Sequence, residues 1–140
     1  MLVSVVVPLH NEEENVVDLY HALKAVMDGG GNEYELLFID DGSTDRTLEL
    51  IEPFEKKDNT VRLLRFRRNF GKAAAWAAGF DYARGDVIVT IDGDLQNDPK
   101  DIPRLVSYLG EYDVVNGWRK DRKDAYIIRK FPSKIANWLI

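Results

Sequence analysis

Short apolar runs alternate along the chain with longer stretches in which apolar residues recur at helical spacing. Four runs, at 2–9, 34–39, 61–66 and 87–91, are closed by polar or turn residues and predict β-strands. The runs at 34–39 and 87–91 are apolar enough to predict strands that are buried on both faces. A shorter run predicts a fifth strand at 113–118.

The stretches between these runs predict four helices, which cover about 16–28, 44–57, 72–83 and 99–109. Ser43 or Thr44 is expected to cap the second helix, and Asp98 followed by a proline is expected to cap the fourth. Buried strands that alternate with amphipathic helices predict an α/β fold. We expect a mostly parallel sheet with helices on both of its faces.

Polar residues follow every predicted strand. Ligands of open parallel sheets bind beyond the carboxyl ends of the strands, so these side chains are expected to converge on one rim. In chain order they are His10, Asn11 and Glu12; Asp40 and Asp41; Arg67, Arg68, Asn69 and Lys72; Asp92 and Asp94; Asn116 and Arg119.

Asp92 and Asp94 stand two residues apart in the segment that follows the fourth strand. In extended chain they point to the same side, and two carboxylates with a diphosphate suit Mg²⁺. Gly93 between them leaves the backbone open to a ligand. The alternative is a solvated acidic turn. Asp41 can accept hydrogen bonds from a base or a ribose. With Asp41 and this pair of aspartates, the rim suits a metal-bound nucleotide.

Composition narrows the possible functions further. The 140 residues suit one domain, and the absence of cysteine excludes disulfides, thiolate zinc sites and cysteine nucleophiles. No signal-peptide pattern is seen, and no apolar run reaches the about 18 residues of a membrane span. The sequence also lacks dinucleotide-binding and Walker-type glycine loops and an evident Ser/His/Asp constellation.

The net charge of −5 is unevenly distributed. Residues 118–140 hold seven Lys or Arg and two Asp, a net of +5, so the remainder carries −10. The acidic body argues against nucleic acid as a partner. The basic segment is interleaved with aromatic residues and predicts contact with phosphate or an anionic membrane surface. A solvated charged helix is the alternative.

Four blocks, VSVVVPLHNEEENV, FIDDGSTDRT, NFGKAAAWAAGF and DGDLQNDP, occur in this order and resemble family 2 glycosyltransferases. The resemblance is to the polyprenyl-phosphate subgroup. It implies a GT-A (Rossmann-like) fold and inverting, metal-dependent transfer of a hexose from a UDP- or GDP-linked sugar to a polyprenyl phosphate. Residues 1–117 would form the nucleotide-sugar-binding core. Residues 118–140 would form an acceptor-side segment at the cytoplasmic membrane face.

The resemblance also implies roles for individual residues, with Mg²⁺ or Mn²⁺ as the cofactor. Asp92, Asp94 and Arg119 would be catalytic, and Asp92, Asp94 and Gln96 would hold the metal and diphosphate. The acceptor phosphate would meet Arg119, Arg129 and Ser133. The nucleotide would meet Pro8, His10, Asn11, Glu12, Asp41, Lys72 and Gly93.

Two other functions stay open. One is a family 2 transferase with a sugar or protein acceptor; the other is a signalling receiver domain, which needs an acidic pair where residues 8–11 read Pro-Leu-His-Asn. Family members normally continue past this length, so we expect a C-terminally truncated, soluble chain that binds donor but transfers sugar poorly or not at all. Self-association through Ile135, Trp138 and Leu139 is a further expectation.

Overall fold

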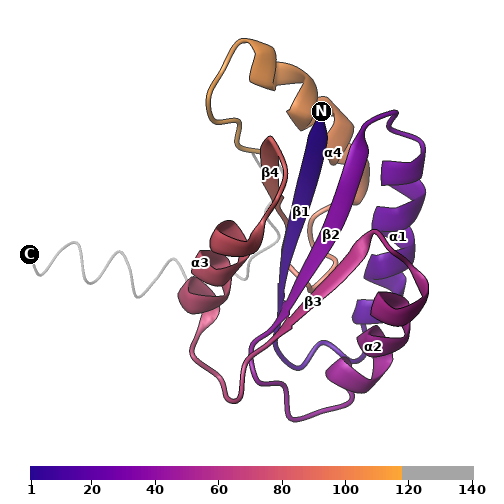
Figure 1. The fold of residues 1–140 in the computed structure, drawn as a ribbon, viewed down its shortest axis with the longest axis vertical. Coiled ribbons are helices and arrows are strands. Elements are labelled where there is room, and N and C mark those ends of the chain that lie inside the picture. Colours follow the sequence, from indigo (N-terminus) through magenta and orange to yellow (C-terminus); the bar gives the residue numbers. More distant parts are fainter. Residues whose placement is uncertain (118–140) are drawn as a thin grey trace, which may run out of the picture.

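The computed structural model describes residues 1–117, which contain a four-stranded parallel sheet in the order β3-β2-β1-β4 (Figure 1). All three neighbouring pairs run parallel, which confirms the predicted α/β class. β1 and β2 lie at the centre of the sheet, and nearly all of their side chains are buried there. The strands are β1 (Leu2–Leu9), β2 (Glu33–Asp40), β3 (Val61–Arg65) and β4 (Val87–Thr90).

Helices cover both faces of the sheet, as predicted (Figure 1). α1 (Val16–Asp28), α2 (Thr47–Lys57) and α4 (Ile102–Ser107) contribute to a core with alternate residues of β1 and β2. α3 (Lys72–Tyr82) packs on the other face, where Ala75 meets the remaining alternate positions. Single 3₁₀ turns, Pro99–Asp101 and Tyr108–Gly110, flank α4. No helix within residues 1–117 is long and apolar enough to cross a membrane.

The fourth and fifth predicted strands need correction. β4 is not buried on both faces, because it lies at an edge of the described sheet and α3 packs over β1 and β2; Ile88 is 41% exposed. Residues 113–117 form no strand, and Val114 is 84% exposed. Asp113, Asn116 and Gly117 disfavour extended pairing and leave few side chains to bury. Residue 118 lies outside the described residues.

One predicted helix cap is confirmed and the other is wrong. The Asp98 carboxylate accepts the N–H of Lys100 at 3.0 Å, with proline next in the chain. α2 begins later than predicted, and neither Ser43 nor Thr44 caps it. The carboxylate that accepts the N–H of Thr47, at 2.9 Å, belongs to Asp45.

Candidate active site

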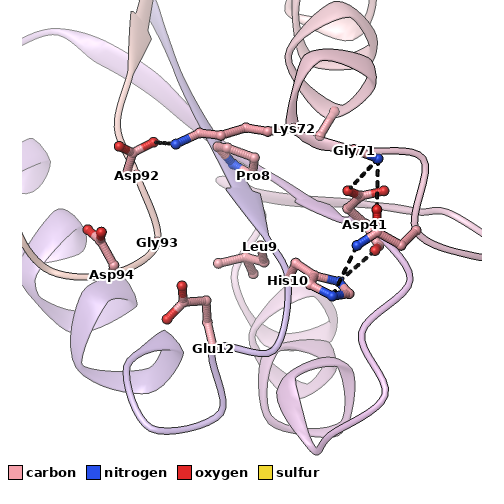
Figure 2. A pocket seen from close by; sticks show the side chains of 12 residues that line it. Pro8, Leu9, His10, Glu12, Asp41, Gly71, Lys72, Asp92, Gly93 and Asp94 are labelled. Carbon is pink, nitrogen blue, oxygen red and sulfur yellow. Dashed lines mark hydrogen bonds and ion pairs between the residues drawn. The ribbon is translucent and has the colours of Figure 1, made fainter. Parts of the chain in front are cut away.

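A pocket of about 250 Å³ lies at the carboxyl ends of β1, β2 and β4, beside the start of α3 (Figure 2). It brings together nine of the predicted residues: Pro8, His10, Glu12, Asp41, Asn69, Lys72, Asp92, Gly93 and Asp94. The other lining residues are Leu9, Gly71 and Ala75. Residues from four separate stretches of the sequence therefore meet in one place, as the rim hypothesis predicts.

Asp41 is 3% exposed and holds the loop that leads into α3. One carboxylate oxygen accepts the N–H of Phe70 at 2.7 Å and the other accepts the N–H of Gly71 at 3.0 Å. Each oxygen keeps lone-pair capacity for a further donor. Asp41 thus fixes the shape of the pocket as well as lining it, and no sequence pattern signals that second task.

Gly42 allows the loops after β2 and β3 to touch. Its φ of +63° lies in the left-handed region, and a Cβ there would lie 2.2 Å from the carbonyl carbon of Arg68. Only glycine fits so close a backbone contact at such a dihedral angle. This contact places Asn69 and Gly71 against the end of β2.

His10 is oriented by hydrogen bonds at both ring nitrogens. Its Nδ1 lies 2.9 Å from the carbonyl oxygen of Asp41, and its Nε2 lies 3.0 Å from the Asn69 side-chain nitrogen. A carbonyl can only accept, so Nδ1 donates and Nε2 accepts from Asn69. The imidazole is therefore held as one wall of the pocket.

Lys72 and Asp92 form an ion pair across the top of the pocket in Figure 2, with 2.5 Å between the Lys72 Nζ and an Asp92 oxygen. Lys72 is the first residue of α3 and Asp92 follows β4. Both side chains are partly exposed, at 58% and 33%. The figure shows Asp92 and Asp94 on one side of the pocket, with His10 and Asp41 on the other.

Gly93 packs closely on the end of β1. A Cβ at this position would lie 2.8 Å from a Leu9 methyl carbon and 3.2 Å from the Pro8 carbonyl oxygen. The segment after β4 can approach β1 this closely only without a side chain at residue 93. The contact between two chain segments thus gives Gly93 a structural role beside the predicted exposure of its backbone to a ligand.

The geometry on the acidic side fits a divalent cation shared with a ligand. Asp94 accepts the backbone N–H of Gln96 at 3.0 Å, and Gln96 itself lines a larger adjoining hollow of about 870 Å³ that shares Asp92 with the pocket. Within residues 1–117, no three His, Cys, Asp or Glu side chains gather closely enough to hold a metal alone. Mg²⁺ is usually held by one or two carboxylates together with the phosphate oxygens of a substrate, and Asp92 and Asp94 are two such carboxylates.

Asn11 lies outside the pocket lining and joins the loops after β1 and β2. Its side-chain oxygen accepts from the N–H groups of Thr44, at 2.8 Å, and Asp45, at 3.3 Å. Its own N–H donates to the Ser43 hydroxyl at 3.0 Å. We call these four residues, Asn11, Ser43, Thr44 and Asp45, the loop clamp. The predicted contact of Asn11 with the nucleotide remains a prediction.

Three predicted residues, Arg119, Arg129 and Ser133, lie outside the described residues, as does the whole 118–140 segment. Arg67 and Arg68 are exposed beside the pocket rather than in its lining, and the Arg68 guanidinium lies over the Phe70 ring. Asn116 lines the adjoining hollow. Leu9, Gly71 and Ala75 also line the pocket but were not predicted. The fold places them there, and their residue types carry no sign of ligand binding.

The sheet order and the pocket at the strand ends define a Rossmann-like α/β domain, and comparison with known families gives its class. The chain matches the family described as Glycosyl transferase family 2 over residues 4–138, and it belongs to that family. It is 49% identical over 140 residues to dodecaprenyl-phosphate galacturonate synthase of Rhizobium johnstonii, covering 98% of this chain and 41% of that protein.

A second relative is the undecaprenyl-phosphate 4-deoxy-4-formamido-L-arabinose transferase of Edwardsiella ictaluri. The two proteins are 40% identical over 140 residues, which is 99% of this chain and 43% of the relative. The chain therefore spans about two fifths of the length of these curated relatives.

Solved structures show the same fold, which confirms GT-A. The mannosyltransferase PcManGT of Pyrobaculum calidifontis, in complex with GDP-Man and Mn²⁺, has a TM-score of 0.70 at 23% identity, over 80% of this chain and 33% of that one. Glucosyl-3-phosphoglycerate synthase of Mycobacterium tuberculosis, in complex with Mn²⁺, UDP and glucosyl-3-phosphoglycerate, has a TM-score of 0.63 at 28% identity, over 77% and 39%.

Proposed function

We propose that this chain is the donor-binding part of a glycosyltransferase that moves a sugar from a nucleoside diphosphate sugar to a polyprenyl phosphate. The pocket at the strand ends carries the proposal, because it joins a polar wall for a nucleoside to a charged end for a diphosphate. The names of both curated relatives contain a polyprenyl phosphate, which supports that acceptor over a sugar or protein.

The nucleoside is proposed to lie against His10, Glu12 and Asp41. The carboxylate of Asp41 can accept N–H groups of a base or hydroxyls of a ribose, and the oriented imidazole supplies a flat wall. The pocket holds no feature that reads uracil against guanine. Both UDP- and GDP-linked donors are therefore to be tested.

The diphosphate is proposed to lie at the start of α3. The start of this helix lines the pocket, and its first turn carries no acidic residue, so the positive end of its dipole lies there. Lys72, at the first helical position, adds an ammonium at the same place. These groups neutralise the charge of a diphosphate.

Asp92 and Asp94, with Gln96 nearby, would hold Mg²⁺ or Mn²⁺ against that diphosphate. When bound, the metal stabilises the charge that develops on the departing nucleoside diphosphate. Solved relatives in complex with Mn²⁺ and a nucleotide or nucleotide sugar support this assignment. The residues of this chain then hold the donor still while its anomeric carbon stays open to attack.

Transfer is proposed as a single displacement with inversion. An oxygen of the acceptor phosphate forms a bond to the anomeric carbon while the bond from that carbon to the diphosphate oxygen breaks, through an oxocarbenium-like state. The acceptor is anionic at neutral pH, so no base is needed to deprotonate it. The name galacturonate synthase on the 49%-identical relative favours a hexose-derived donor, whereas the 40%-identical relative is named for an arabinose, which is a pentose.

Calorimetric titration with UDP, GDP and their sugars, with Mn²⁺ or with a chelator, tests donor binding. Asp92→Asn is expected to remove most of the metal-dependent affinity and to leave the fold intact, because Asp92 stands on a rim. Asp81→Asn, the same change at an exposed position of α3, is the matched control. Equal nucleotide affinity with metal and with chelator would refute metal-dependent donor binding.

A further inference from the structure

The Lys72 ammonium pairs with Asp92, one of the two carboxylates proposed above to hold a divalent metal. We propose that Lys72 acts as a built-in substitute cation, which keeps free divalent metal off Asp92 until a nucleoside diphosphate draws the ammonium away. The inference rests on the proposed function and deepens it, because it states how donor and metal depend on each other. Lys72 is then a binding residue that determines the order in which nucleotide and metal bind.

The first argument is geometric. The Lys72 Nζ lies 2.5 Å from an Asp92 oxygen, so a metal bound to that oxygen and the ammonium would compete for one place. Asp94, the other carboxylate beside Gly93, has an oxygen engaged by the Gln96 N–H. A free metal ion would therefore meet one occupied carboxylate and one partly occupied one, which is a weak site for Mg²⁺ or Mn²⁺.

The second argument concerns the helix. Lys72 stands at the first position of α3, where the positive end of the helix dipole disfavours a cation. The first turn of α3 carries no acidic side chain, so the compensating charges come from other elements. Asp41 accepts the N–H of Gly71, and Asp92 pairs with Lys72 itself. A diphosphate at the same helix end would supply more negative charge, and the ammonium would move to it.

The third argument concerns the freedom of the side chain. Lys72 is 58% exposed, and its Nζ lies over the Trp76 ring, 5.9 Å from the ring centre. A change of rotamer suffices to carry the ammonium into the pocket that Lys72 already lines. Asp92 then keeps both oxygens for the metal, so nucleotide and metal bind cooperatively, each raising the affinity for the other.

Binding of Mn²⁺ alone, without nucleotide, tests the proposal by calorimetry or electron paramagnetic resonance. Lys72→Met is expected to bind free Mn²⁺ about fivefold more tightly than the unchanged chain. A fivefold change corresponds to the about 1 kcal/mol of an exposed ion pair, which Mn²⁺ no longer has to break in this variant. Lys72→Arg keeps the cation and is expected to keep the weak affinity. Lys57→Met, an equal charge change at an exposed position of α2, controls for overall charge.

A second measurement follows the coupling. UDP or GDP is expected to raise Mn²⁺ affinity strongly in the unchanged chain and about fivefold less strongly in Lys72→Met. Lys72→Met that binds free Mn²⁺ no more tightly than Lys57→Met overturns the proposal. If neither nucleotide binds any variant, the proposed donor site fails instead, and the comparison with free Mn²⁺ still decides the role of Lys72.

Discussion

Single residues line this pocket and hold its structure at the same time. Asp41 presents a carboxylate to the pocket while both of its oxygens hold the backbone before α3. His10 lines the same wall and is fixed by a carbonyl and an amide. Substitutions at either residue would therefore alter the shape of the site together with its chemistry, and loss of binding alone would not separate the two.

Asp58 gives a pH-dependent prediction at this scale. Its carboxylate accepts from the Tyr20 hydroxyl at 2.8 Å and the Thr60 N–H at 2.9 Å, and it pairs with Lys24 at 3.1 Å. Burial alone would raise the pKa of Asp58, but the hydrogen bonds from Thr60, Tyr20 and Lys24 outweigh burial and hold that pKa well below its usual range.

The folded state therefore binds fewer protons at Asp58 than the unfolded state does. The resulting stability is present above the unfolded pKa of about 3.9 and is lost as pH falls through the folded value. Asp58→Asn should lower the free energy of unfolding at pH 7 by about 1–3 kcal/mol and by less at pH 3. Urea unfolding at both pH values measures this, with Asp81→Asn as control; equal losses would contradict it.

At the scale of elements, the loop clamp joins the segments that follow β1 and β2. Asn11 has a φ of +53°, a left-handed conformation that asparagine tolerates better than most residues. Its side-chain oxygen accepts from two N–H groups and a hydroxyl of residues 44 and 45. The neighbouring residues His10 and Glu12 line the pocket, so the clamp determines where they stand.

Asn11→Ala should destabilise the fold by about 1–3 kcal/mol, since it leaves N–H groups without their acceptor and strains the backbone. Nucleotide affinity should fall as well. Asn11→Gly relieves the backbone strain but still lacks the acceptor, so its loss of stability should be smaller and not zero. Thermal unfolding and calorimetry measure both variants. An Asn11→Gly chain as stable as the unchanged one would show that the side-chain bonds contribute nothing.

Elements were predictable where the information is local. β-branched runs and helical spacing located all four described strands and helices, and Asp98 caps the 3₁₀ turn that leads into α4. Ser43 and Thr44 were misassigned as caps because their partner, Asn11, lies on another loop. The exposure of Ile88 depends on which helix covers the sheet edge, which an apolar run does not encode.

The same distinction holds for the site. The rim was predictable because strand ends in a parallel sheet must meet, and nine predicted residues line the pocket. The partner of Asp92 was not predictable, since the ammonium of Lys72 arrives from a different element and only the packing of α3 brings it there.

At the scale of the whole molecule, charge is segregated between an acidic body and the basic segment 118–140. We predict that the chain binds anionic vesicles. Each basic residue near such a surface contributes about 1 kcal/mol, and salt screens the attraction. Co-sedimentation should rise with the anionic lipid fraction and fall with added salt. A variant with Lys120, Lys123 and Lys130 changed to Gln is expected to bind less; binding indifferent to lipid charge and salt would discard the prediction.

The central place of β1 in the sheet has a consequence for how the protein is made. The ribosome delivers β1, β2 and β3 before β4, although all four strands belong to one sheet, and a domain generally folds as a unit. The wall formed by His10 and Asp41 therefore meets Asp92 and Asp94 only after β4 has been made and pairs with β1. A nascent chain that ends before β4 lacks the acidic side of the pocket, so the pocket is completed only late in synthesis.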